Sequence, residues 1–110
     1  LIDIDIVRVA QSGFTVESNG EIIINQFSFH LANKGNTPIR FAISLLGAPE
    51  LQVISPIAFL ELKPGAAEHV PAFIRGPRQA FTKGKARAVI IVKASNGNEF
   101  QRELTFFGPE

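Results

Sequence analysis

The sequence predicts an all-β protein, an antiparallel immunoglobulin-like β-sandwich of about seven strands. Apolar residues recur with a period of two along most of the chain, which is typical of strands that bury one face. Turn signals rich in Gly, Pro and Asn separate these runs, and no stretch has a helical period. The chain has 110 residues, 45% of them hydrophobic, so residues 1–110 are expected to form a single sandwich domain with one core.

The first three predicted strands follow one another closely. Residues 3–10 alternate apolar and polar side chains before a break at Ser12 and Gly13. Residues 14–17 form a short second piece, and the Ser-Asn-Gly sequence that follows predicts a tight turn. That turn leads into the longest predicted strand, residues 21–33.

The apolar pattern of this third strand changes phase near Asn25 and Gln26. Ile22 and Ile24 share one face, whereas the aromatic side chains after the shift have the opposite parity. Two structures account for the change: a β-bulge that adds one residue, or a strand that begins in one sheet and finishes in the other.

The polar segment NKGNTP, residues 33–38, separates the third strand from the fourth. One interpretation is a binding loop at the end of the sandwich. The other is a turn in which every residue has a backbone role. Asn33 and Asn36 tolerate left-handed angles and cap their neighbours, Gly35 supplies a positive φ, and Pro38 starts the next strand. We favour the turn, because these side chains offer little reactive chemistry.

The remaining pattern predicts short strands joined by turns of Gly, Pro or Asn. Pro71 lacks a backbone donor, so its strand is expected to lie at a sheet edge or to have the N–H side of this residue facing solvent. Residues 85–94 are apolar on both faces and are expected to be central, and Ser-Asn-Gly-Asn at 95–98 predicts a hairpin. After the polar segment, the expected strands are residues 39–45, 51–54, 57–62, 66–75, 85–94 and 99–107.

The residue types exclude several kinds of chemistry. The chain has no Cys, which removes disulfides, thiolate metal ligands, iron–sulfur ligands and thiol nucleophiles. His30 and His69 fall on separate strands and are expected to be structural or surface residues. Asp3 and Asp5 share one strand face and could chelate a hard cation, although solvated carboxylates are the simpler interpretation. We therefore expect no catalytic residue, no metal site and no cofactor in this domain, and no enzyme activity.

Basic residues gather in one part of the sequence. The net charge is only +1, and nucleic acid is not an expected partner because no aromatic or glycine interleaving accompanies the basic residues. Between Glu68 and Glu99, however, there is no acid, and cations flank the loop 76–84. This loop is either simply solvated or a docking patch for the acidic surface of a protein partner. The candidate patch, in which Phe81 is expected to be exposed, comprises Arg75, Arg78, Phe81, Lys83, Lys85 and Arg87.

The order of these features resembles a known family. The opening VRVAQSGF, the run NGEIIINQFSFHLANKGNTPIRFAISLLG, the segment KPGAAEHVPAFIRGP and the terminal FFGP occur in turn. Together they resemble the C-terminal immunoglobulin-like domain of the FixG/CcoG family of cytochrome c oxidase accessory proteins. The resemblance runs from about Ile6 to Pro109.

This resemblance implies a role that the residues alone do not. Proteins of this family are membrane-bound, with iron–sulfur motifs elsewhere in the protein, and are associated with assembly of cbb-type cytochrome oxidases and with copper handling. The chain starts at Leu1 without Met or a leader, so we expect a C-terminal fragment of such a membrane protein. The domain would be a non-catalytic interaction or positioning module on the periplasmic face of the bacterial inner membrane. The alternatives are a generic interaction domain of an unrelated envelope or adhesion protein, and a domain that itself binds copper.

An immunoglobulin-like strand order also predicts where the loops lie. The chain would enter at the end that carries residues 33–38 and 95–98, and the loop 76–84 would lie at the opposite end with the C-terminus. A transmembrane segment before Leu1 would then hold the basic loop away from the membrane, where a periplasmic protein could reach it.

Overall fold

The computed structural model describes residues 2–8, 13–17 and 19–110, and side chains are described for Ile4 and for residues 13–17 and 19–110. The secondary structure is almost entirely β, with two short 3-10 turns. In chain order, the elements are β1 (Ile2–Arg8), β2 (Thr15–Glu17), β3 (Ile22–Asn33), β4 (Ile39–Leu46), β5 (Gln52–Ile54), η1 (Pro56–Phe59), β6 (Glu61–Leu62), β7 (Ala67–Pro77), η2 (Arg78–Ala80), β8 (Lys85–Ala94) and β9 (Glu99–Phe107).

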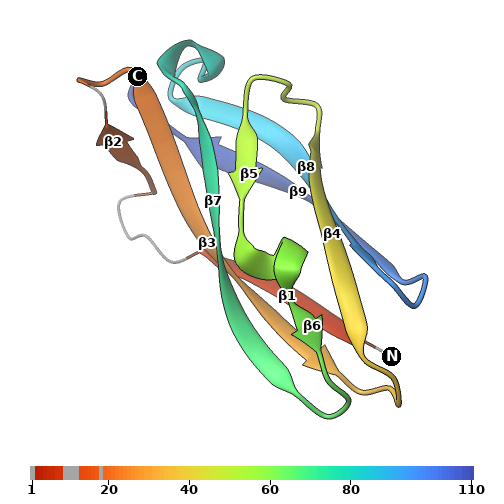
Figure 1. Cartoon of the computed structure of the whole chain (residues 1–110). Coiled ribbons are helices and arrows are strands. Elements are labelled where there is room, and N and C mark those ends of the chain that lie inside the picture. The colour runs from red at the N-terminus through yellow and green to blue at the C-terminus, as the bar shows by residue number, and fades with distance from the viewer. Residues whose placement is uncertain (1, 9–12, 18) are drawn as a thin grey trace.

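These strands form two antiparallel sheets that pack face to face (Figure 1). The first sheet, sheet A, has the order β1-β3-β7-β5, with β2 also paired to β3. The second, sheet B, has the order β6-β4-β8-β9. The predicted immunoglobulin-like sandwich is confirmed, and β8 is central in its sheet as its two-sided apolar pattern indicates.

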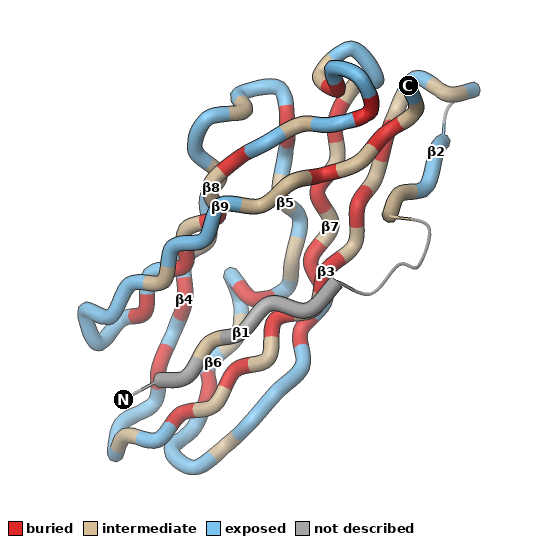
Figure 2. The backbone as a smooth tube through the Cα atoms, turned by 180° about the vertical axis from the view of Figure 1, so that it is seen from behind, coloured by how far each residue is buried: buried red, intermediate tan, exposed pale blue. Residues whose placement is uncertain are grey.

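The core lies between the two sheets, and burial alternates along the long strands (Figure 2). Val70, Ala72 and Ile74 of β7 point inward as the period-two pattern predicts. Phe27 of β3 meets Phe106 of β9 edge to face, with ring centroids 5.5 Å apart and planes at 81°. Such a pair adds to the stabilisation that comes from burying two large rings.

The phase shift in β3 is neither a bulge nor a sheet crossing. β3 pairs with β7 in one unbroken register from Ile22 to Ala32, and Asn25 occupies an inward position with no exposed surface. The inward series therefore continues through Asn25, which is polar where an apolar residue would be expected. Its amide Nδ2 donates to the carbonyl of Phe107, and its Oδ1 accepts from the amide of the same residue, both at 2.9 Å.

Two local predictions need correction or qualification. Of the predicted strand 57–62 only Glu61 and Leu62 are extended, as β6, because Pro56 and a bond from the Ile57 amide to the Ser55 hydroxyl oxygen start the 3-10 turn η1. Pro71 lies opposite Ser28, at a point where β7 has only β3 beside it, since β5 pairs no further than Phe73. The edge prediction therefore holds for the first half of β7 only.

The last strand, β9, leaves one long edge of sheet B without a neighbouring strand in the described chain. An open edge can recruit another chain, and an inward-pointing charge is one way to prevent this. Arg102 pairs with buried Ile90, so it has the parity of the inner face, and its guanidinium lies 5.5 Å from the centre of the Phe100 ring. We infer that Arg102 protects this edge.

Replacing Arg102 with Val is therefore expected to increase self-association several-fold, because a β-branched residue favours strand pairing and no longer brings a charge into a new interface. Analytical ultracentrifugation over a concentration series measures the effect. The control is Gln101→Val, which makes the same β-branched change on the outer face of β9. Equal association of the two variants would contradict the protective role.

Candidate functional site

The loops of the sandwich gather at two opposite ends (Figure 1). At the first, the amide of Gly65 donates to the carbonyl of Asn33 and the amide of Ser95 donates to that of Arg40, both at 2.8 Å. This end, called the N-terminal end, also holds the start of β1, since Ile2 pairs with Asn33. The expected placement of residues 33–38 and 95–98 is confirmed.

The opposite end, called the C-terminal end, carries the loop 76–84 and the chain terminus. The amide of Arg78 donates to the carbonyl of Glu21 at 2.9 Å, and that of Gly108 donates to the carbonyl of Gly84 at 2.9 Å. The predicted basic loop therefore lies far from the start of β1, as the assumed strand order requires.

The polar segment 33–38 is a turn in which Asn33 caps a neighbour, as predicted, but the expected left-handed conformations are not found in it. The positive-φ residues of the described chain lie elsewhere, so neither Asn33, Gly35 nor Asn36 adopts a left-handed conformation. Instead, the buried side chain of Asn33 organises the turn: Nδ2 donates to the carbonyls of Thr37 and Leu62, and Oδ1 accepts from the amide of Gly35, all at 2.9 Å. The side-chain amide of Asn33 is thus already hydrogen-bonded to the backbone of three other residues and is not free to bind a ligand, which argues against a binding loop.

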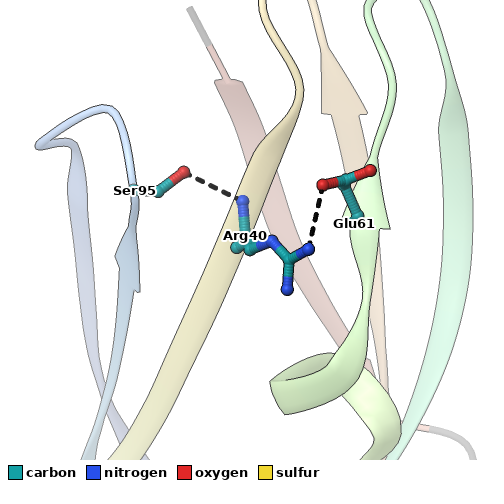
Figure 3. Close-up of polar contacts among 3 residues, drawn as sticks. All are labelled: Arg40, Glu61 and Ser95. Atoms are coloured by element: carbon teal, nitrogen blue, oxygen red, sulfur yellow. Dashed lines mark hydrogen bonds and ion pairs between the residues drawn. The ribbon is translucent and has the colours of Figure 1, made fainter.

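Neighbouring polar contacts at this end also join strands (Figure 3). The amide of Arg40 donates to the hydroxyl oxygen of Ser95 at 2.9 Å, and its guanidinium lies 3.2 Å from a carboxylate oxygen of Glu61. Arg40 thus links β4 to both the β8–β9 hairpin and β6. Both charged side chains are well exposed, so the ion pair itself contributes little stability.

The predicted docking patch is altered by the position of Phe81. This residue is 7% exposed and belongs to the core, which contradicts the prediction that it lies at the surface. Its ring packs against Gly108, where an added Cβ would lie 2.9 Å from the ring. The loop 76–84 has no clear alternation, so the sequence carried no signal for the direction of this side chain.

The cations of the patch fall into separate groups. Arg75 is half-buried on the outer face of sheet A, and its Nε lies 3.4 Å from Oε1 of Glu17. Arg78 is exposed beside Gly20, and Lys83 is exposed in the turn before β8. Lys85 and Arg87 point outward from sheet B at the start of β8.

Lys85 and Arg87 meet at an open pocket of about 310 Å³ at the C-terminal end. The pocket is also lined by the loop 47–51, including Glu50, and by Ala80, Thr82 and Ala86. Two cations on one side of a concave surface can receive a carboxylate from another protein. The exposed cations of the predicted patch are Arg78, Lys83, Lys85 and Arg87, and we call this surface the basic end.

The structure also brings together residues that the sequence placed apart. His30 of β3 and His69 of β7 are direct register partners, and their rings stack with centroids 3.9 Å apart and planes 7° from parallel. Their positions on different strands had led us to expect the two histidines to be apart, and this expectation is wrong. The register between β3 and β7 brings the two histidines into contact. The residues next to each histidine in the sequence do not indicate this register.

Two further observations concern metals and membranes. The side chains of Asp3 and Asp5, the sequence-based candidates for a hard-cation site, lie outside the described residues. Among the described residues, no group of three or more His, Asp or Glu is placed to hold a metal ion. Nor does the described part of the chain contain a helix long and apolar enough to span a bilayer.

The fold and its surface define an immunoglobulin-like sandwich domain with an exposed basic end. The chain belongs to the family described as "IG-like fold at C-terminal of FixG", whose model matches residues 1–109. It is thus a FixG-related domain, as the sequence resemblance predicted. This membership sets aside the alternative of an unrelated envelope or adhesion protein.

A solved structure has the same fold. The crystal structure of a FixG-related protein from Vibrio parahaemolyticus matches 99% of this chain and 97% of its own, with a TM-score of 0.72 and 14% sequence identity. At this identity the likeness shows the fold alone. Among curated proteins, none matches the sequence.

Proposed function

We propose that the chain is the non-catalytic interaction and positioning module of a membrane-bound iron–sulfur accessory protein. That protein would take part in the assembly of cbb-type cytochrome oxidase and in copper handling, with this domain on the periplasmic face of the inner membrane. Membership of the FixG C-terminal family is the observation that carries the proposal. Since the chain has no Cys, the iron–sulfur ligands of such a protein would come from other segments.

The basic end is the surface proposed to meet the partner. It lies opposite the end where β1 begins, so a membrane segment preceding the chain would direct the basic end away from the bilayer. The exposed cations there would attract an acidic protein surface and speed its association. We expect no nucleic acid among the partners.

Reversing two of these charges tests the docking role. In the full-length protein, the double variant Lys85→Glu, Arg87→Glu is expected to reduce cross-linked partner recovery by about tenfold, because like charges would now face the acidic surface. Recovery from the parent protein should also fall as salt is raised. Assembly of the oxidase, measured by its haem spectrum in membranes, should fall with recovery.

The matched control is Lys63→Glu, Lys93→Glu, which changes the charge equally at exposed positions beside the turns of the N-terminal end. This variant should retain partner recovery and oxidase assembly. If both double variants behave alike, the basic end is not the docking surface. If deletion of the whole domain leaves assembly intact, the proposed role itself is wrong.

A further inference from the structure

The stacked histidines lie on the outer face of sheet A, away from the basic end. Phe29, Leu31 and Val70, their neighbours along the two strands, point into the core. His30 is half-buried and His69 is exposed, so both imidazoles can be reached from solvent. The pair lies two positions from the Ala32–Ala67 end of a two-strand register that runs without a break.

The surroundings of the pair leave room above the rings. The next register pairs on the same face are Ser28 with Pro71 and Ala32 with Ala67, all small side chains. On the far side of β3, the backbone register pairs His30 with Asp5 of β1. A row of three metal-ligating residue types therefore crosses three adjacent strands.

We propose that His30 and His69 form a binding site for a divalent first-row transition metal ion, with one ring nitrogen of each histidine as a ligand. Two nitrogens that share a tetrahedral ion at about 2.0–2.1 Å are about 3.3 Å apart. The rings stack almost parallel with centroids 3.9 Å apart, so both side chains must rotate to open the stack before their in-plane lone pairs converge on one ion. The paired strands hold both residues in place, and water completes the coordination shell.

The ligand type sets the order of affinities. Imidazole favours Cu²⁺, Ni²⁺ and Zn²⁺ over Mg²⁺ and Ca²⁺, which prefer oxygen ligands. Among these ions Cu²⁺ is expected to bind most tightly and Zn²⁺ more weakly. This revises the expectation of a domain without metal ligands, which rested on the two histidines being apart. The inference does not depend on the basic end or on its partner.

Titration of the chain with CuCl₂ tests the site, with the N-terminus acetylated so that its amine cannot bind copper. We expect one Cu²⁺ per chain by calorimetry and superhyperfine splitting from two imidazole nitrogens by electron paramagnetic resonance. His30→Gln and His69→Gln should each weaken binding by about tenfold or more, since the second imidazole of a chelating pair acts at high effective concentration. The double variant His30→Gln, His69→Gln should bind Cu²⁺ only slightly more weakly than either single variant.

The control variant is Glu103→Gln, which removes an exposed carboxylate from the opposite sheet and should leave the affinity unchanged. Circular dichroism and urea midpoints establish that the glutamine variants remain folded. Because the ion would join two strands of the folded state only, Cu²⁺ should raise the melting temperature of the parent chain but not of His69→Gln. Equal affinity of the parent and both histidine variants, a spectrum without two nitrogens, or equal binding of Mg²⁺ would overturn the proposal.

Discussion

Asn33→Ala is expected to lower the free energy of unfolding by about 2–4 kcal/mol, because three hydrogen bonds are lost and buried backbone groups are left unpaired. Asn33 is 1% exposed, and its side chain holds the carbonyls of Thr37 and Leu62 and the amide of Gly35. One of these bonds reaches β6 of the opposite sheet, so the variant also loosens the contact between sheets. Urea denaturation monitored by circular dichroism measures the change.

Asn36→Ala in the same segment provides the comparison. This side chain is exposed, so its removal should change the free energy of unfolding by less than about 0.5 kcal/mol. Similar losses for the two variants would mean that the backbone of residues 33–38, rather than the Asn33 side chain, maintains the turn.

Asn25→Leu is expected to cost about 2 kcal/mol, although the new side chain has the same branching and the same number of heavy atoms and is apolar. The Asn25 amide takes the place of a neighbouring strand: it both accepts from and donates to the backbone of Phe107 at the end of the edge strand β9. Leucine removes both of these bonds to Phe107. Amide hydrogen exchange at Phe107 should therefore become faster, in addition to the loss seen by urea denaturation.

Gln26→Leu is the control, because residue 26 lies on the outer face of the same strand. It should leave the exchange rate of Phe107 close to that of the parent. If Asn25→Leu were as stable as the parent, burial of the apolar leucine side chain would outweigh the two hydrogen bonds, and Asn25 would not be a required link.

The two asparagines have a common role that bears on the docking surface. Both lie at inward positions of β3, and each joins sheet A to sheet B, Asn33 near the N-terminal end and Asn25 towards the C-terminal end. Asn25 holds the last residue of β9, while Gly108 bonds to Gly84 and packs against Phe81. These contacts position the turn before Lys85 and hence part of the basic end.

Most of the elements could be predicted from the chain, because a strand with one buried face carries a period-two pattern in its own residues. The inward faces of β4, β7 and β8 and the hairpin at 95–98 follow from such local signals. The prediction was wrong where a residue departed from its pattern for a distant partner. Asn25 seemed to mark a change of phase, although its partner is Phe107.

The candidate sites likewise combine features that the local sequence indicates with features that depend on distant residues. The cations of the basic end could be recognised from the charge pattern, but Phe81 was placed at the surface because its loop has no periodicity. Lys85 and Arg87 share a pocket with the loop 47–51 only after the strands assemble.

The linear order of residues therefore determined the fold class, the strands, the turns and the family. Only the tertiary structure decided which asparagine holds which backbone group, where Phe81 packs, and that His30 meets His69. The physical reason is that alternation depends on the contrast between core and solvent, which each strand encodes locally. Contacts between side chains depend instead on the register of paired strands and on the packing of the two sheets, which bring distant residues together.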